Sequence, residues 1–168
     1  MRISFRQSSL AFARRAWDEV RGSDGCTARQ NARTLDGWTI HADLYGTDDR
    51  CVVLAHGGRF EKGSWEKQAR ALVRAGFYAL AIDLRGLGTS KEGPQSARSD
   101  FGSPLDALAA VRYLHDNGAK TVSVVGASMG GDAAEVALAE TKPGDIDRVV
   151  LLNLCFFARR DHFVTLPS

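Results

Sequence analysis

The stretch that decides the fold is Thr121-Val122-Ser123-Val124-Val125-Gly126-Ala127-Ser128-Met129-Gly130-Gly131. Its first five residues are mostly β-branched, which predicts a strand buried on both faces of a parallel sheet. An alanine-rich helix is expected at residues 132–140, so the glycines stand at a strand-to-helix junction. G-x-S-x-G in that context predicts a tight turn that strains the backbone of Ser128 and holds its Oγ above the sheet edge.

This turn is typical of nucleophilic catalysis. A helix beginning behind the serine supplies positive potential and backbone N–H groups, so the N–H of Met129 is the expected first oxyanion donor. A phosphate-binding loop is the competing interpretation, but no Gly-Lys-Ser/Thr follows the glycines. Gly86-Leu87-Gly88 resembles the start of a dinucleotide fingerprint, yet Lys91 stands where its third glycine belongs. The sequence therefore favours a serine nucleophile over nucleotide binding.

Strands and helices alternate on both sides of the turn. Buried strands are expected at residues 51–55, 78–82, 121–125 and 149–152, and helices at 64–75, 104–116 and 132–140. Ser64 and Ser103 are the predicted N-caps of the first two helices, and Asp106 completes a capping box with Ser103. Such alternation predicts a mostly parallel sheet between two helical layers, the α/β/α arrangement.

An antiparallel hairpin is expected before the first buried strand. Asp36-Gly37 predicts a two-residue turn, because both residues tolerate positive φ. In the strand that follows, Trp38, Ile40, Ala42 and Leu44 alternate with polar residues, as in a strand with one buried face. His41 falls on the polar side of that alternation, which favours a solvent-facing histidine over a catalytic one.

Three segments in order resemble the α/β-hydrolase superfamily, in its esterase, lipase and serine-aminopeptidase-like branches. Residues 52–58 resemble the HG-x segment, residues 83–90 resemble the D-x-R-G-x-G-x-S turn, and residues 126–131 resemble the nucleophile elbow. The resemblance spans roughly residues 34–152. It implies an α/β-hydrolase-type fold and a serine hydrolase that cleaves an ester, thioester or amide of a small acyl substrate through an acyl-enzyme on Ser128.

The resemblance also implies roles for residues near the elbow. Gly58 would donate the second oxyanion N–H, with Arg59 as the neighbouring candidate. His56 and Asp83 would have structural roles, His56 beneath the oxyanion loop and Asp83 in its own turn. Phe60, Glu61 and Trp65 are candidates for the entrance of the site, although surface packing explains them equally well.

The base and acid of the family pattern are missing from their usual places. In this fold they follow Ser128 in the order acid, then histidine. Only 40 residues follow Ser128, whereas two further strand–helix units would need about 60 residues at roughly 30 per unit. Asp161 and His162 are the tail candidates, but neighbours in an extended segment point in opposite directions. We therefore expect impaired activity or, alternatively, a catalytically inactive binding or interaction domain.

The residues after 152 form an atypical tail rich in phenylalanine. A frameshift or premature stop shortly after Leu152 is the hypothesis for a C-terminally truncated hydrolase domain. Without later strands, residues 149–152 would form an open sheet edge, where self-association or pairing with a complementing chain is expected. The predicted organisation is a basic amphipathic extension at residues 1–25 and a partial hydrolase domain at 26–168.

Composition excludes several classes of protein. Twenty-two Lys and Arg against 20 Asp and Glu give a net charge of +2, which provides no electrostatic reason to expect nucleic acid as a partner. No apolar run reaches the ~18 residues of a membrane span, and Cys26, Cys51 and Cys155 form no metal-binding or disulfide pattern. No cofactor or metal is expected. We expect a soluble cytoplasmic protein, with the arginine-rich start as an alternative organelle-targeting segment.

Overall fold

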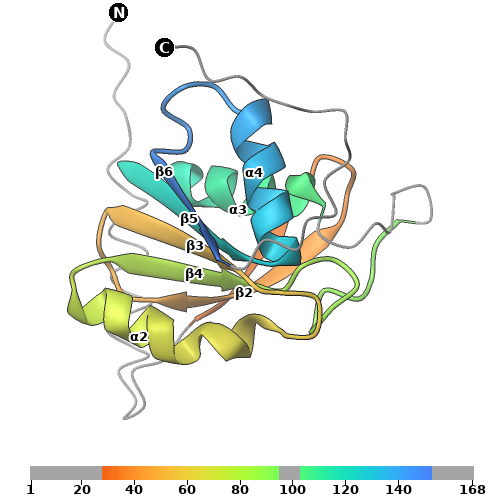
Figure 1. Cartoon of the computed structure of the whole chain (residues 1–168), viewed down its shortest axis with the longest axis horizontal. Coiled ribbons are helices and arrows are strands. Elements are labelled where there is room, and N and C mark those ends of the chain that lie inside the picture. Colours follow the sequence, from red (N-terminus) through yellow and green to blue (C-terminus); the bar gives the residue numbers. More distant parts are fainter. Residues whose placement is uncertain (1–27, 95–102, 153–168) are drawn as a thin grey trace, which may run out of the picture.

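The structure, a computed structural model, describes residues 28–94 and 103–152. These residues form a six-stranded sheet in the order β1-β2-β4-β3-β5-β6 (Figure 1). The strands are β1 (Arg29–Arg33), β2 (Thr39–Tyr45), β3 (Arg50–Ala55), β4 (Tyr78–Ile82), β5 (Thr121–Ala127) and β6 (Arg148–Leu152). The chain pairs β3 in parallel with β4 and β5, and β5 with β6, while β2 is antiparallel to both β1 and β4. The predicted mostly parallel sheet with an N-terminal hairpin is confirmed.

Helices lie on both faces of the sheet. The short 3-10 helix η1 (Lys62–Trp65) and α2 (Glu66–Arg74) are on one side, and α3 (Pro104–Asp116) and α4 (Met129–Glu140) are on the other (Figure 1). No helix in the described ranges is long and apolar enough to cross a membrane. The expected N-terminal extension and the tail with Cys155, Asp161 and His162 lie outside those ranges.

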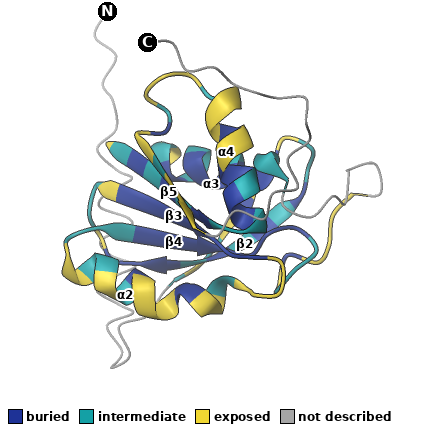
Figure 2. Ribbon diagram, viewed as in Figure 1, coloured by how far each residue is buried: buried dark blue, intermediate teal, exposed yellow. Residues whose placement is uncertain are grey.

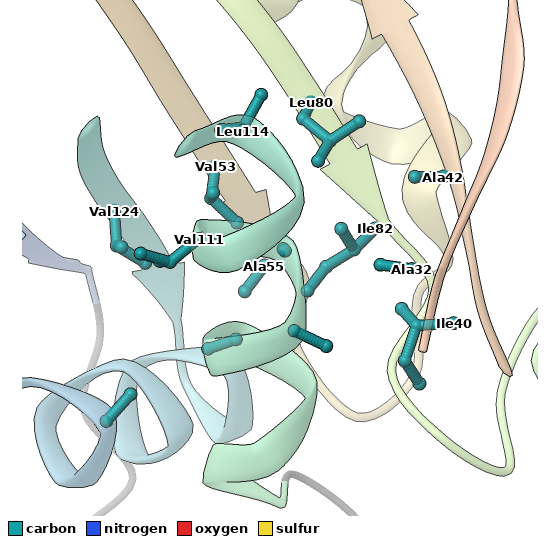
Figure 3. Packing of buried hydrophobic residues seen from close by; sticks show 14 of the residues in the cluster. Ala32, Ile40, Ala42, Val53, Ala55, Leu80, Ile82, Val111, Leu114 and Val124 are labelled. Carbon is teal, nitrogen blue, oxygen red and sulfur yellow. The ribbon is translucent and has the colours of Figure 1, made fainter. Parts of the chain in front are cut away.

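Two apolar clusters hold the layers together. The larger lies beneath α3 and α4, where the expected stripe of α3 packs on the sheet (Figure 3). Its helix residues include Ala107, Ala110, Val111 and Leu114, and its strand residues include Val53, Leu80, Ile82, Val122 and Val124. The smaller lies beneath α2 and joins Trp65 and Ala69 to Tyr45, Val52, Leu54, Ala79 and Ala81. The central strands β3 and β4 are buried from both sides (Figure 2).

The hairpin turn differs from the prediction. The N–H of Gly37 donates to the carbonyl of Thr34 (3.1 Å), and the N–H of Thr34 donates to the carbonyl of Trp38 (2.9 Å). Residues 35–37 therefore form a three-residue loop rather than a two-residue turn. Gly37 has φ +89°, as expected of the left-handed residue that completes a three-residue hairpin. The Asp-Gly pair predicts the hairpin but does not distinguish these two loops.

One predicted N-cap, Ser64, and the capping-box role of Asp106 are wrong, for different reasons. Ser64 lies inside η1, where its Oγ donates to the carbonyl of Glu61 (2.7 Å), so it does not cap α2. Ser103 does cap α3, accepting from the N–H of Leu105 (3.3 Å). Asp106, however, accepts from the backbone N–H (2.9 Å) and Nε (2.8 Å) of Arg85. A buried guanidinium needs these acceptors more than the helix end needs a second cap.

The last strand is the main departure from the expected burial. The sequence predicts that residues 149–152 form a strand buried on both faces, but β6 lies at the sheet edge (Figure 2). Val150 is 45% exposed and Leu152 is 43% exposed. Only the face that carries Val149 packs against the core beneath α4. The apolar sequence predicts burial because it assumes a neighbouring strand on each side. Among the described residues, no strand lies beyond β6.

Candidate active site

Ser128 stands between β5 and α4 in a conformation that L-residues rarely adopt. Its φ of 50° and ψ of −119° make it the one non-glycine residue with positive φ in the described ranges. Hydrogen bonds hold the turn from both sides: the N–H of Ser128 donates to the carbonyl of Leu152 (2.9 Å), and its own carbonyl accepts from Gly131 (2.7 Å) and Asp132 (3.0 Å). Such backbone strain, about 1–3 kcal/mol, persists only where surrounding structure enforces it.

The flanking glycines are required by close backbone approach. A Cβ atom at Gly126 would lie 2.3 Å from the carbonyl oxygen of Gly130, and one at Gly130 would lie 2.4 Å from that of Ala55. Both distances are too short for any side chain. The first turn of α4 is thereby pressed against β3 and β5, and α4 begins at Met129, three residues earlier than the sequence indicated.

The loop after β3 lies against this turn. The place where a Gly57 Cβ would stand is 3.4 Å from the Cβ of Ser128, and the corresponding place at Gly58 is 3.6 Å from the Cε of Met129. Met129 is the first residue of α4, so its N–H has no partner within the helix. The structure therefore brings together the three residues that the sequence singled out: Ser128, Met129 and Gly58.

His56 supports the loop from below. It is 1% exposed, its Nδ1 lies 2.8 Å from the carbonyl oxygen of Gly57, and its Nε2 lies 3.2 Å from the backbone N of Leu84. A carbonyl only accepts and an amide N–H only donates, so Nδ1 carries the proton and Nε2 accepts. Burial lowers the pKa of His56 and keeps the ring neutral. With both nitrogens engaged, His56 is unavailable as a base for Ser128.

Asp83 holds the other end of the same loop. Its carboxylate is fully buried and accepts from the backbone N (2.7 Å) and Nζ (2.9 Å) of Lys62, and from the N and Oγ1 of Thr89 (both 2.8 Å). Burial alone raises the pKa of Asp83, but the hydrogen bonds from Lys62 and Thr89 outweigh it and lower the pKa overall. Asp83 thus joins the 57–62 loop to its own turn. The sequence does not identify Lys62 as a partner of Asp83, because nothing local marks a contact between residues 21 positions apart.

The entrance residues separate into two groups. Phe60 is 62% exposed, and its ring lies near Gly57, at 3.6 Å from the place of a Cβ there. Glu61 and Arg59 are exposed on the same loop. Trp65, in contrast, is buried in the cluster beneath α2 and is not an entrance residue. Its interior position agrees with the apolar spacing that predicted the helix.

No base is in place among residues 28–94 and 103–152, because the Oγ of Ser128 makes no hydrogen bond with any of them. The Nε2 of His115 is engaged with the carbonyl of Asp145 (2.8 Å). Asp161 and His162 fall outside these ranges. The same residues contain no cluster of His, Cys, Asp or Glu suited to a metal ion. Cys51 is buried, which raises its pKa to about 12 and keeps the thiol protonated.

The geometry agrees with comparisons to known proteins. A family model described as "Serine aminopeptidase, S33" matches residues 46–164. The chain belongs to the α/β-hydrolase superfamily. The matched range includes both the His56–Gly58 segment and the Ser128 turn, and it extends into the tail as far as residue 164.

Relatives and solved structures show the same membership. The AB hydrolase superfamily protein YisY of Bacillus subtilis is 28% identical over 116 residues, covering 67% of this chain and 42% of YisY. The human putative protein-lysine deacylase ABHD14B is 44% identical over 62 residues, covering 36% of this chain and 30% of the relative. An epoxide hydrolase from an endophytic Streptomyces is 32% identical with a TM-score of 0.63, covering 77% of this chain and 37% of that one. The chain thus spans less than half the length of these α/β-hydrolases.

Proposed function

We propose that this α/β-hydrolase chain is a serine hydrolase that cleaves an ester, thioester or amide of a small acyl substrate through an acyl-enzyme on Ser128. One observation carries the proposal: a serine with φ 50° stands at the strand-to-helix turn, with Gly57 close to its Cβ, the first N–H of α4 next to it, and an Oγ that no described residue engages in a hydrogen bond. The relative described as a putative protein-lysine deacylase is consistent with acyl chemistry.

The reaction follows from these positions. The Oγ of Ser128 attacks the substrate carbonyl carbon and gives its proton to a base. The N–H groups of Met129 and Gly58 bind the oxyanion that forms, and collapse of this intermediate releases the alcohol, thiol or amine. Water then releases the acid and restores Ser128. Loss of one oxyanion donor lowers such rates by about 10²–10³-fold.

The mechanism needs a base that accepts the proton of Ser128, and the described residues do not supply one. Because no described residue forms a hydrogen bond with the Oγ of Ser128, proton transfer depends on the tail candidates His162 and Asp161 or on a group supplied from outside the chain. We therefore propose low turnover for the 168-residue chain alone. Binding and the oxyanion donors still support some reaction over water when a triad is incomplete.

A fluorophosphonate probe tests the nucleophile. We expect one equivalent to attach to Ser128, as shown by peptide mass spectrometry, and no attachment to Ser128→Ala. Ser64→Ala is the matched control, because Ser64 is an exposed serine whose Oγ bonds only locally to Glu61. Hydrolysis of p-nitrophenyl acetate by wild type and His162→Ala then tests the base, for which a loss of about 10²-fold is expected. Failure of wild type to label overturns the assignment of Ser128.

A second candidate function is a hydrolase-like binding domain without turnover. The absence of a hydrogen bond to the Oγ of Ser128 among the described residues favours it, since a serine without a base is a poor nucleophile. A stable phosphonate monoester would then bind wild type and Ser128→Ala with equal affinity, and neither protein would label or hydrolyse ester. Labelling of wild type at Ser128 excludes this candidate.

A further inference from the structure

The loop that carries Gly58 turns sharply before it reaches η1. The N–H of Phe60 donates to the carbonyl of Gly57 (3.0 Å), which places Gly58 inside a four-residue turn. Gly58 is exposed near the side chain of Met129, and its N–H makes no hydrogen bond with any described residue. One hydrogen bond does not orient an exposed turn. The direction of the Gly58 N–H therefore depends on how the two ends of the loop are held.

Both ends of this loop meet one buried carboxylate, that of Asp83. At the far end, Oδ1 of Asp83 accepts from the backbone N–H of Lys62 (2.7 Å), and Oδ2 accepts from its Nζ (2.9 Å). At the near end, Nε2 of His56 lies 3.9 Å from the same Oδ1. Lys62 is thus joined to Asp83 twice, once through its backbone and once through its ammonium group. Two charge-assisted bonds to one carboxylate fix the orientation of a residue as well as its position.

The carboxylate of Asp83 is itself held in place. It is fully buried, and a Cβ at Gly88 would overlap with it, so the backbone of Gly88 closes one side. Thr89 adds two further hydrogen bonds, since its N–H and its hydroxyl both donate to Oδ2 (both 2.8 Å). Together with the two bonds from Lys62, these occupy about all the lone-pair sites of a carboxylate. Asp83 is therefore a fixed acceptor to which a loop can be attached.

The positive charge of Lys62 balances a carboxylate that lies in the interior. Burial raises the pKa of Asp83, and the hydrogen bonds from Lys62 and Thr89 lower it. The neighbouring His56 is neutral, and Asp43 adds a second acid whose pKa the charge of Asp83 raises. Removing one partner of a buried ion pair leaves the other charge uncompensated, which is strongly disruptive. Loss of the ammonium group would therefore weaken the acceptor that holds the loop.

We propose that Lys62 is a positioning residue for the reaction at Ser128. Its ammonium group, paired with Asp83, holds the 57–62 loop where the N–H of Gly58 binds the oxyanion. This inference rests on the proposed function, because the oxyanion forms only if Ser128 attacks an acyl carbon. The side chain of Lys62 is only 13% exposed and its Nζ is engaged in the pair. Lys62 therefore acts through the loop and does not touch the substrate.

The rate of fluorophosphonate labelling of the 168-residue chain tests this role. Lys62→Gln removes the charge and keeps the backbone N–H. We expect the maximal labelling rate (kinact) at Ser128 to fall about 10-fold, less than the roughly 10²–10³-fold that follows complete loss of an oxyanion donor. The half-saturating probe concentration (KI) should stay the same, because the probe still binds.

Two further lysine variants serve as controls. Lys62→Arg keeps the charge and should retain most of the wild-type kinact. Lys67→Gln is the matched control and should leave kinact unchanged, because Lys67 is exposed on α2 and makes no hydrogen bond or ion pair with the described residues. Asp83→Asn removes the same ion pair without leaving a buried charge, so it tests the inference even if Lys62→Gln does not fold. It should lower kinact to a similar extent.

Backbone dynamics test the same role without turnover. NMR relaxation should give order parameters of about 0.85 for the amides of Gly58 and Phe60 in wild type, and below about 0.6 in Lys62→Gln or Asp83→Asn. A residue that only stabilised the fold would change urea unfolding but not the order parameters of the folded loop.

The outcomes separate the two proposals. Order parameters or a kinact that stay at wild-type values in both Lys62→Gln and Asp83→Asn overturn the role of Lys62. A wild type that does not label overturns the proposed function instead. The order parameters then still decide whether Lys62 holds the loop.

Discussion

The backbone N–H of Ser128 donates a hydrogen bond to the carbonyl oxygen of Leu152 at 2.9 Å. Leu152 is the last residue of the edge strand β6, so the strained serine is tied to the least protected strand of the described sheet. The free energy that holds β6 on β5 therefore also holds the Ser128 turn in place.

Hydrogen exchange at the Ser128 amide should follow the docking of β6. Val149→Ala removes about two methylene equivalents from the face of β6 that packs beneath α4, a loss of about 1 kcal/mol for a partly buried side chain. We expect exchange at Ser128 to rise roughly fivefold by NMR. Val136 lies on α4 and is 44% exposed, so Val136→Ala should change the exchange rate of the Ser128 amide less than twofold. Equal effects of the two variants would contradict the coupling.

Replacement of Ser128 should reveal the strain of the turn. Ser128→Gly removes the Cβ that makes φ 50° unfavourable, whereas Ser128→Ala keeps it. We expect Ser128→Gly to be more stable than Ser128→Ala by about 1 kcal/mol, although glycine normally destabilises a folded chain. Urea unfolding measures the difference. If alanine proves equal or better, the positive φ of this turn does not exist in solution.

Glycine-to-alanine substitutions should destabilise the protein where neighbouring backbone leaves no room for a Cβ, and should be tolerated where there is space. A Cβ at Gly126 meets backbone atoms of the neighbouring turn at 2.3 Å, and that backbone has little room to move. We expect Gly126→Ala to lower the free energy of unfolding by about 2 kcal/mol or more. Gly63→Ala is the control, since its nearest contact is 3.8 Å away on the flexible side chain of Glu61, and its stability should be unchanged or slightly higher.

The buried ring of His56 should make stability depend on pH. Burial lowers its pKa in the folded chain below the ordinary 6.5. As pH falls below 6.5, the unfolded chain gains a proton that the folded chain does not. The free energy of unfolding then falls by up to about 1.4 kcal/mol per pH unit until the lowered pKa is reached. Urea unfolding at pH 7.5 and pH 5.5 should show a larger drop for wild type than for His56→Gln. Equal drops would mean that His56 is not buried and neutral.

Local chemistry allowed the sequence to predict much of the fold and part of the site. Short apolar runs predicted β3, β4 and β5, and the small residues around Ser128 predicted the turn, because each of these depends on residues within one short segment. The proximity of Gly58 to Met129 came from the family resemblance. The pairing of β3 with β5, confirmed in the structure, brings those two residues together.

Contacts set by the path of the chain were not predictable in the same way. Asp106 carries a capping pattern, but its partner Arg85 arrives from another loop. Lys62 meets Asp83 only because η1 lies over the end of β4. The exposure of β6 depends on which strands lie beside it, and apolar periodicity does not reveal its neighbours.

The double attachment of the 57–62 loop has a practical consequence for protein engineering. His56 fixes the loop at Gly57 and Asp83 fixes it at Lys62, both through backbone atoms that remain when the intervening side chains are exchanged. The intervening residues Arg59, Phe60 and Glu61 are exposed. A library randomised at these three positions would alter the surface beside Ser128 while keeping the backbone that supports it, so this loop tolerates exchange of its side chains.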